Sequence, residues 1–386
     1  MAKLIEITGK AISGEWGTDD ETGDGTPVLR TTNFTNHGAV DFSNVVTRDL
    51  GRKDLSGKFL RHGDIIIEKS GGSDTQPVGR VIFFDGPENT YLFNNFTGLL
   101  RVKDQQHWFP RYVFYALLAN YRFGRTKLFE NRTTGLHNLQ TESYVAKTEI
   151  RETDVDSQMV ICAMLDRLKV VIESRQHQLH TLDTLIKARF VETFGDPELN
   201  PMGWPIEALG DLLSVEPQNG LYKPQSDYVQ DGTGIPILRI DAFYDGKVTD
   251  FSRLKRLNCS DIERSRYLLM ENDIVINRVN SIEYLGKCAW ITGMIEPTVF
   301  ESNMMRFHVD EFRFDPCYLT RLLCSSFIYK QILNRAKKAV NQASINQGDV
   351  QNFKILVPPI GLQKQYAAFV SQVEKSKVVW KYSTLN

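Results

Sequence analysis

The sequence predicts an α+β fold in which two similar globules are separated by long helices that pair as an antiparallel coiled coil. Three observations predict it. Residues 156–196 carry apolar side chains at heptad spacing, the sequence before them recurs after them, and a shorter heptad stretch follows the second copy. The expected divisions are residues 1–150, 151–196, 197–358 and 359–386.

Composition sets the first limits. A chain of 386 residues can form two domains, each with its own core. The net charge of −1 gives no overall basic balance, so any site for nucleic acid must be a local patch. The five cysteines lack the C-x-x-C spacing, which predicts reduced thiols without disulfides or a zinc site.

The same sequence predicts a cytoplasmic protein. No apolar run approaches the ~20 residues of a membrane span, and the N-terminus lacks the apolar region of a signal peptide.

The chain repeats itself at a slowly drifting offset. The sequence GTPVLR at residues 25–30 recurs as GIPILR at residues 234–239, an offset of 209. Residues 64–67 (DIII) recur as residues 273–276 (DIVI) at the same offset. Because the matches keep their order along the chain, we interpret them as an internal duplication.

Each copy predicts α+β structure. Residues 64–67 and 273–276 are typical of buried strands, and the cluster SGGSD at residues 70–74 is typical of a turn. Toward the end of each copy a segment of helical length follows, at residues 110–119 and 316–330.

The central heptad stretch predicts one long helix. About 40 residues at ~1.5 Å each give a rod of roughly 60 Å. The rod should end at FGDP, residues 194–197, where glycine and proline stop a helix. Such a rod is a spacer or the core helix of one large domain, and the duplication favours the spacer. The apolar seam consists of Ile161, Leu165, Leu168, Ile172, Leu179, Leu182 and Ile186.

The rod is duplicated as well. Gln158 and the apolar residues after it recur from Gln363 onward, which predicts a second helix over roughly residues 360–380 with Phe369 and Val373 on its seam. Its ~27 residues, against ~40 in the first helix, leave about a third of the first seam uncovered. We expect the uncovered part at residues 179–194, available to a partner protein or to the second globule.

Basic residues gather at the same place in both copies. Residues 111–129 hold Arg111 and three further cations without any acid, and residues 321–348 hold Arg321 and four further cations without any acid. Repeated basic segments in a neutral protein predict contact with phosphates. The polar residues after each segment are of the types that reach base edges.

A second candidate surface follows the matched strands. Different residues come after the two PVLR/PILR motifs and after the strands that begin at Asp64 and Asp273. A shared scaffold with different loops suits two modules that recognise different sequences. Together the two surfaces predict DNA contacts from Arg30, Thr32, Asn33, Lys69, Ser70, Arg122, Arg125, Lys127, Arg132, Thr133, His137, Lys223, Arg239, Asn277, Arg278, Asn280, Arg335, Lys337, Lys338, Gln342 and Ser344.

Catalytic alternatives find little support among the residues. The chain has no phosphate-binding G-x-x-x-x-G-K-[ST] loop, no [DNS]-P-P-[YF] element and no glycine-rich turn for S-adenosylmethionine. A metal-dependent nuclease site at Asp64 and Glu68 loses its second acid in the other copy, and no metal site is expected. A DNA methyltransferase or nuclease with diverged motifs, and a duplicated protein-binding scaffold, remain as alternatives.

The order of these parts resembles the specificity subunit of type I restriction-modification enzymes. The resemblance rests on KARFVETFGDP at residues 187–197, SGEWG at residues 13–17 and the two PVLR/PILR motifs. It also includes ASIN at residues 343–346 and VPPIGLQKQ at residues 357–365. It covers essentially the whole chain.

The resemblance implies two target-recognition domains that each recognise one half of a bipartite, asymmetric site in double-stranded DNA. The helices would set the gap between the halves and dock two methyltransferase subunits, and restriction/translocase subunits would join the complex. The resemblance also implies that this chain is not an enzyme and has no cofactor, since S-adenosylmethionine and ATP would bind to partner subunits. The short second helix departs from the family pattern.

Overall fold

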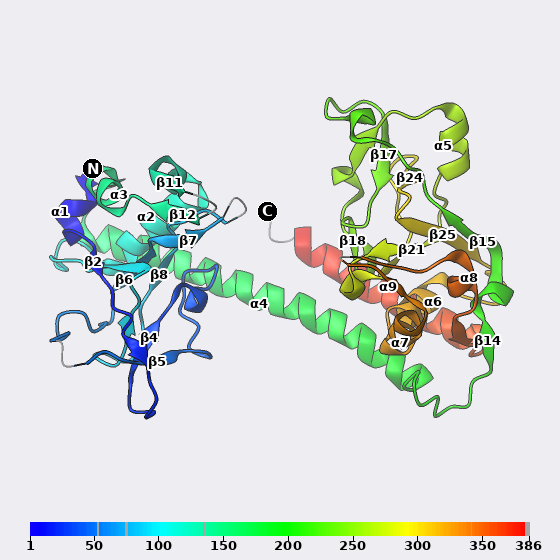
Figure 1. The fold of residues 1–386 in the computed structure, drawn as a ribbon, viewed down its shortest axis with the longest axis horizontal. Coiled ribbons are helices and arrows are strands. Elements are labelled where there is room, and N and C mark those ends of the chain that lie inside the picture. The colour runs from blue at the N-terminus through cyan, green and yellow to red at the C-terminus, as the bar shows by residue number, and fades with distance from the viewer. Residues whose placement is uncertain (52–53, 74–75, 134–135, 341, 383–386) are drawn as a thin grey trace. The chain divides into compact units, whose positions relative to one another are not determined.

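The computed structural model of the protein describes the chain except for residues 52–53, 74–75, 134–135, 341 and 383–386, and leaves the side chains of residues 132, 133, 136 and 378–382 undescribed. The described residues form two units, Met1–Glu173 and Ser174–Asn386. The long helix α4, Val155–Phe194, begins in the first unit and ends in the second (Figure 1). The mixed α+β class predicted from the sequence is confirmed.

The first unit is built from small sheets around helix α2. Its sheets have the orders β2-β10-β6-β8, β3-β5-β4-β9, β11-β12-β7 and β1-β13. The strands are β1 Ala2–Lys3, β2 Ile12–Ser13, β3 Thr18–Asp19, β4 Thr26–Leu29, β5 Val46–Asp49, β6 Ile65–Glu68, β7 Ser70–Gly72, β8 Val81–Phe83, β9 Leu92–Phe93, β10 Thr97–Leu100, β11 Glu130–Thr133, β12 Leu136–Leu139 and β13 Glu149–Ile150. The helices are α1 Leu4–Thr8, η1 Thr31–Asn33, α2 Pro110–Arg122, η2 Arg125–Phe129 and α3 Thr141–Lys147.

The second unit repeats this plan with additions. Its sheets have the orders β15-β25-β21-β23-β19-β18, β16-β20-β17-β24, β22-β27-β26 and β14-β28. The strands are β14 Ile206–Ala208, β15 Leu213–Asn219, β16 Tyr228–Val229, β17 Ile235–Leu238, β18 Phe243–Tyr244, β19 Gly246–Val248, β20 Lys255–Leu257, β21 Ile274–Asn277, β22 Val279–Asn280, β23 Cys288–Trp290, β24 Val299–Phe300, β25 Met304–Val309, β26 Lys337–Lys338, β27 Ala343–Ser344 and β28 Lys354–Leu356. The helices are η3 Leu209–Leu212, η4 Gln225–Asp227, η5 Phe251–Arg253, α5 Asp261–Tyr267, η6 Ile282–Tyr284, α6 Pro316–Leu323, α7 Ser326–Arg335, α8 Gln347–Gln351 and α9 Ile360–Tyr382.

The duplication is visible in the hydrogen bonds as well as in the sheets. The PVLR and PILR motifs form β4 and β17, and each pairs in parallel with a later strand, Val28 with Leu92 and Ile237 with Val299. The Tyr112 hydroxyl donates to the Arg151 carbonyl at 2.9 Å, and the Tyr318 hydroxyl donates to Leu356 at 3.1 Å. The buried strands predicted at residues 64–67 and 273–276 are confirmed as β6 and β21.

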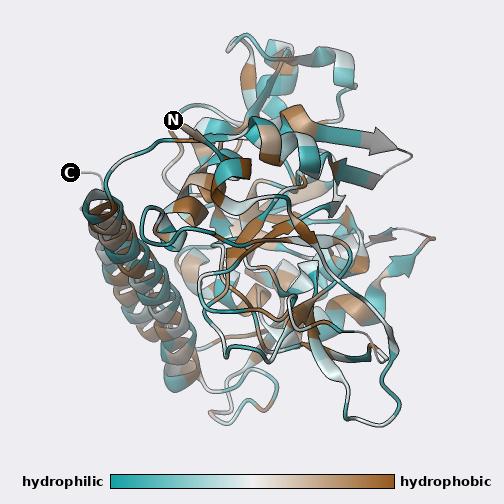
Figure 2. Ribbon diagram, turned by 90° about the vertical axis from the view of Figure 1, so that its left-hand side faces the viewer, coloured by the Kyte–Doolittle hydropathy of each residue, from teal (hydrophilic) through white to brown (hydrophobic). Residues whose placement is uncertain are grey.

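Two local predictions were wrong. The cluster at residues 70–74 was predicted as a turn, but Ser70–Gly72 forms strand β7 against β12, and residue 74 lies outside the described residues. The helical segment predicted at residues 316–330 is two helices, α6 and α7, because the chain leaves helical geometry at Cys324 and Ser325. The central strands carry hydrophobic residues while the long helices mix hydrophobic and hydrophilic positions (Figure 2).

Within the second unit, α9 packs antiparallel on the last turns of α4. Tyr366 contacts Phe194, with ring centroids 5.6 Å apart, whereas Lys377, two turns or more further along α9, forms an ion pair with Asp183. Gly195 ends α4 with φ of 80°, as FGDP predicted. The α4–α9 pair therefore runs from residue 194 back toward residue 183.

The seam at residues 179–194 was expected to be left uncovered by the second helix and open to a partner protein or to the second globule; α9 and the core of the second unit both contact it. Ile186, Phe190 and Phe194 are buried in the core of the second unit, together with Tyr366 and Val373. The exposed residues of the predicted seam lie toward the other end of α4: Leu168 and Ile172 are 57% and 54% exposed. The reason is the β14–β28 pair, which joins the strand after α4 to the strand before α9 and so starts α9 beside the end of α4.

Candidate nucleic-acid interface

A three-stranded sheet occurs at the same place in both units and joins the two surfaces that the sequence proposed separately. In the first unit β12 pairs with β11, Arg132 opposite His137, and with β7, Asn138 opposite Ser70. In the second unit β27 pairs with β26 and with β22, so that Ser344 lies opposite both Lys337 and Val279. We call these the first and second three-stranded sheets.

A bend after the central strand of each unit produces the sheet. The chain leaves β6 and enters β7 through Lys69, whose carbonyl accepts from the Leu139 N–H at 2.8 Å. In the second unit it leaves β21 and enters β22 through Arg278, whose carbonyl accepts from the Ile345 N–H at 3.0 Å. The loop after the strand and the hairpin after the basic segment are therefore one structure.

Three predicted and exposed cations of the first unit lie just before strand β11 of its three-stranded sheet. Arg122 ends α2, and Arg125 and Lys127 lie in η2; all three are exposed. Their side chains are only lightly held, since Arg122 donates to the Asn36 carbonyl at 3.4 Å and Arg125 to the Asn120 side chain at 3.2 Å. They are available to bind phosphates.

The other predicted residues of the first unit differ in accessibility. Lys69 donates to the Ser13 hydroxyl at 2.9 Å, and burial, with Lys58 nearby, lowers the pKa of its ammonium group. Thr32 is exposed and Ser70 is half-buried. Arg132 and Thr133 lie in β11, but their side chains fall outside the described residues.

Two predictions in the first unit are wrong because the side chains are buried, and a third residue is only partly accessible. Asn33 accepts from the Arg30 N–H and donates to the carbonyls of Asp41 and Asn44, so it organises a loop. His137 is buried, with Nδ1 2.7 Å from the Glu130 carboxylate. Arg30 is half-buried and donates to the Asn44 carbonyl.

The second three-stranded sheet and its hairpin loop present exposed basic and amide side chains. Lys337, Lys338 and Gln342 are exposed, and Ser344 is half-buried. Arg278 and Asn280 are half-buried at the neighbouring strand, where Arg278 donates to the Ser302 carbonyl at 3.2 Å and Asn280 accepts from the Ser281 N–H. Lysine suits contacts with phosphates, and glutamine and serine suit contacts with base edges, so side chains of both kinds lie next to each other here.

Four predicted contacts of the second unit form interactions within the protein. Burial contradicts the prediction for Asn277, whereas those for the half-buried Lys223, Arg239 and Arg335 stay predictions. Lys223 is paired with Glu263 at 3.0 Å and with Asp227, which raises the pKa of its ammonium group. Asn277 is fully buried.

The other two are arginines. Arg239 donates to the Tyr228 hydroxyl at 3.0 Å and lies near Glu301. Arg335 donates to the carbonyls of Gln331 and Asn352 at the end of α7.

The first arginine of each basic segment also has a structural role. Arg111 binds the Asp166 carboxylate of α4 at 2.7 Å, and Arg321 binds the Asp245 carboxylate at 3.2 Å. Their charges are neutralised locally, as is that of Lys330 by Glu198, so these residues do not contribute to a basic surface.

Exposed apolar residues within the basic segments escaped the sequence analysis. Phe123 follows Arg122 and is 78% exposed, while Val340 follows the two lysines of β26 and is 99% exposed. The signal that could have found them is an apolar residue inside a cationic, turn-forming run. Such residues can insert beside bases in protein–DNA complexes.

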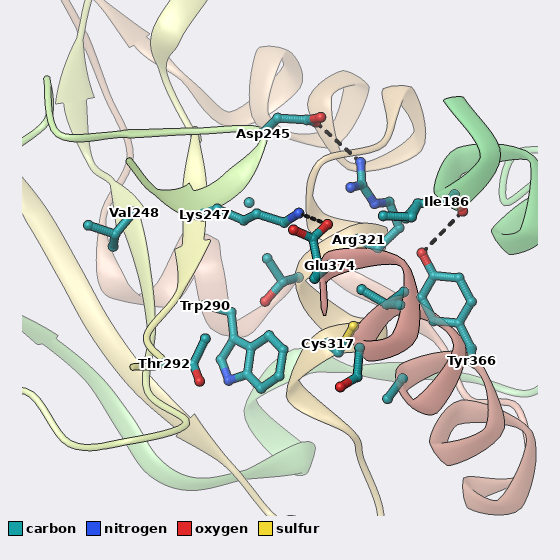
Figure 3. Close-up of a pocket in the computed structure, with 15 residues that line it drawn as sticks. Ile186, Asp245, Lys247, Val248, Trp290, Thr292, Cys317, Arg321, Tyr366 and Glu374 are labelled. Atoms are coloured by element: carbon teal, nitrogen blue, oxygen red, sulfur yellow. Dashed lines mark hydrogen bonds and ion pairs between the residues drawn. The ribbon is translucent and has the colours of Figure 1, made fainter. Parts of the chain in front are cut away.

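A cavity lies in the second unit where α4, α6 and α9 meet strand β19 (Figure 3). Its volume is about 340 Å³, and Trp290 and Ile186 contribute apolar walls. The charged residues are paired with one another: Lys247 with Glu374, and Arg321 with Asp245. It therefore offers no free charge to a ligand and serves as the junction between the helices and the sheet.

The exposed face of α4 is the other candidate binding surface. Its opposite face is fixed to the first unit: Gln158 and Cys162 are buried and Asp166 binds Arg111. Eight exposed apolar side chains cover the broad remainder of the helix circumference, and we call this set the α4 stripe: Met159, Val160, Ile161, Met164, Leu168, Val170, Val171 and Ile172. Leu165 and Leu179 are half-buried, Leu182 packs on the second core, and Phe369 lies on that core beneath Arg189.

Within the described residues, no three histidine, cysteine, aspartate or glutamate side chains are grouped so that they could hold a metal ion. No described helix is both long and apolar enough to cross a membrane.

Comparison with known proteins identifies the duplicated architecture. Residues 201–379 match the family model described as "Type I restriction modification DNA specificity domain". The "Putative type I restriction enzyme MjaX specificity subunit" of Methanocaldococcus jannaschii is 34% identical over 188 residues. That match covers 47% of this chain and 43% of the relative's length.

A second relative matches nearly the whole chain. The "Type I restriction enzyme EcoKI specificity subunit" of Escherichia coli is 24% identical over 369 residues, 90% of this chain and 75% of that protein. The crystal structure of a type I restriction-modification S subunit from M. genitalium matches 99% of this chain and 91% of its own, with a TM-score of 0.57 and 15% identity. This likeness shows that the fold is shared.

Proposed function

We propose that this chain is a type I restriction-modification specificity subunit with a non-catalytic role in sequence-specific recognition of double-stranded DNA. Each unit would recognise one half of a bipartite, asymmetric site. One observation carries the proposal: the same three-stranded sheet occurs in both units and presents different side chains in each. The relatives are named specificity subunits, so the alternative of an enzyme that acts alone is not supported.

The division of labour within each sheet follows from side-chain chemistry. Lys337 and Lys338 are exposed point charges that bind phosphates, which fix position without sequence information. Gln342 and Ser344 can donate and accept hydrogen bonds at base edges in the major groove. In the first unit Arg122, Arg125 and Lys127 would supply the phosphate contacts, and the differing sheets would give the two half-sites different sequences.

The helices would set the distance between the half-sites and bind the methyltransferase subunits. The α4 stripe supports this role because its apolar side chains are exposed. Further along the same helix, α9 and the second core bury the apolar side chains at residues 186–194. A partner helix with an apolar face could cover it in the same manner. Two methyltransferase subunits and the restriction/translocase subunits would complete the complex, and S-adenosylmethionine and ATP would bind to those partners.

The first test is DNA selection. The purified chain with its methyltransferase subunits is incubated with a random duplex library, and we expect enrichment of a two-part motif with a fixed gap. The double variant Lys337→Ala/Lys338→Ala should weaken binding to the selected duplex and lower the slope of log affinity against log salt by about 2, since two phosphate contacts are lost.

The matched control is Lys375→Ala, an exposed lysine of α9 outside both three-stranded sheets. It should leave the salt slope unchanged. Enrichment of no motif, or an equal loss of slope in the control, would contradict the proposed function.

The second test concerns docking. Leu168→Asp places a charge in the α4 stripe without touching a buried core, so the variant should remain folded and bind methyltransferase subunits at least tenfold more weakly, because an unpaired charge would be buried. Leu199→Asp, at a site 78% exposed beyond the end of α4, is the control. Co-purification and analytical ultracentrifugation measure the binding of methyltransferase subunits to both variants. If Leu168→Asp binds them as well as the wild type does, the α4 stripe is not their binding site.

A further inference from the structure

Two thiols of the second unit contact each other, and the proposed function uses neither. Cys288 lies in β23 and is buried, and Cys324 is the exposed residue that follows α6. Their sulfur atoms are 3.5 Å apart although the residues are 36 positions apart in sequence. A disulfide bond is ~2.05 Å long, so an approach of roughly 1.5 Å would join them.

The pair lies on an open groove. A cavity of about 350 Å³ is lined by both cysteines, by the glycine and lysine that precede Cys288, and by Ser325 and Tyr329. A small oxidant can therefore reach Cys324 from solvent, whereas Cys288 is covered. The other cysteines are differently placed: Cys162 and Cys317 are buried, and Cys259 is half-buried in a separate part of the unit.

The environment makes one sulfur the better nucleophile. The hydrogen bond shared with the Cys288 sulfur, with Arg321 nearby, lowers the pKa of Cys324 although desolvation opposes the shift. The same hydrogen bond and burial raise the pKa of Cys288. Thiolates, not thiols, attack peroxides, so Cys324 is the attacking residue and Cys288 the resolving one.

We propose that Cys288 and Cys324 form a redox-active dithiol that a hydroperoxide converts into an intradomain disulfide. The Cys324 thiolate attacks the peroxide, takes one oxygen as a sulfenic acid and releases an alcohol or water. The Cys288 sulfur then attacks the Cys324 sulfur, loses its proton, and the sulfenic oxygen leaves as water. Two thiols and one hydroperoxide thus give one disulfide, one alcohol and one water.

The bond would tie together both sides of the second three-stranded sheet. Cys288 follows β22 and η6. Cys324 lies two residues before the start of α7, which leads into β26. Oxidation would fix the positions of these two strand connections relative to each other. Formation of the bond itself does not depend on DNA recognition.

The test uses the full chain and hydrogen peroxide. Each cysteine of the second unit falls in a separate tryptic peptide, so a linked pair is assigned directly by mass spectrometry after alkylation without reduction. We expect a Cys288–Cys324 linked peptide, two hydrogens lighter than the sum of its parts. It should form at least about tenfold faster than Cys259 is oxidised, since burial and the nearby Glu263 raise the pKa of the Cys259 thiol.

Two variants make the assignment decisive. In Cys288→Ser, Cys324 should accumulate as a sulfenic acid that dimedone traps, and in Cys324→Ser, Cys288 should remain reduced. Circular dichroism checks that both variants are folded. Oxidation of Cys324 without a cross-link to Cys288 would overturn the proposal. So would a cross-link that fails to form when the protein is oxidised at high dilution, because such a bond joins two molecules.

Discussion

The two units share their internal framework and differ on their surfaces. Gln158 and Gln363 occupy the same place, fully buried at the start of α4 and α9. The Gln158 side chain accepts from the Phe109 N–H and donates to the His107 and Thr153 carbonyls. Gln363 accepts from the Asp315 N–H and donates to the Pro358 carbonyl in the same way.

The buried aspartates show where the framework itself has diverged. Asp64 and Asp273 precede equivalent strands, β6 and β21. Arg101 holds Asp64 through two hydrogen bonds of 2.7 Å. The equivalent position is His308, and Asp273 is held by His308 at 3.0 Å together with Arg306 at 3.1 Å. Two short hydrogen bonds from one arginine in the first unit correspond to two longer contacts from an arginine and a histidine in the second. The buried carboxylate is therefore common to both units, whereas the residues that bind it differ.

This difference predicts unequal sensitivity to mutation. Arg101→Leu removes both charged hydrogen bonds from Asp64 and should destabilise the first unit by about 3–5 kcal/mol, because a buried charge loses its partner. His308→Leu leaves Arg306 on Asp273 and should cost only about 1–3 kcal/mol. Denaturant unfolding, followed by hydrogen exchange of peptides from each unit, measures the free energy of unfolding of both variants. Equal losses of stability would contradict the expectation that Arg306 still binds Asp273 after His308 is removed.

The shared glutamines predict the opposite result, equal effects in the two units. Gln158→Leu and Gln363→Leu each leave buried backbone groups without partners, at a cost of about 2–4 kcal/mol. The exposed Gln365→Leu on α9 is the matched control and should change stability by less than about 0.5 kcal/mol. A clear difference between the two buried variants would show that the helix starts are not equivalent.

The smallest expected effect is a pH dependence confined to the second unit. Burial raises the pKa of Glu301, although its hydrogen bond from the Ile240 N–H and the nearby Arg239 oppose the shift. A raised carboxyl pKa means that the folded unit binds the proton more tightly than the unfolded chain. Glu301 therefore costs stability above its folded pKa, and the cost is relieved as pH falls toward 4.5.

Glu301→Gln should remove this relief. The measurement is the thermal unfolding of the second unit in wild type and variant. The difference in stability between the two proteins is compared at neutral pH and near pH 4.5. The first unit is an internal reference, since its peptides should respond alike in both proteins. A variant that gains no relative stability at neutral pH would contradict the account.

Much of the fold could be predicted because its signals are local or repeated. The heptad spacing and FGDP located α4, and GTPVLR with GIPILR located β4 and β17. The candidate site was only partly predictable. Charge runs indicated Lys337 and Lys338, which are exposed and stay predictions, but they could not show that Lys223 pairs with Glu263 or that Asn277 is buried.

The sequence alone determined that there are two copies, two helices and two basic segments, since periodicity and duplication need no knowledge of contacts. Only the tertiary structure decided which seam is covered. A heptad pattern shows that a helix face is apolar, but the β14–β28 pair determines where α9 begins and thus that residues 186–194 are buried. It likewise joined separate loops into the three-stranded sheets, because strand pairing between distant segments is a long-range choice.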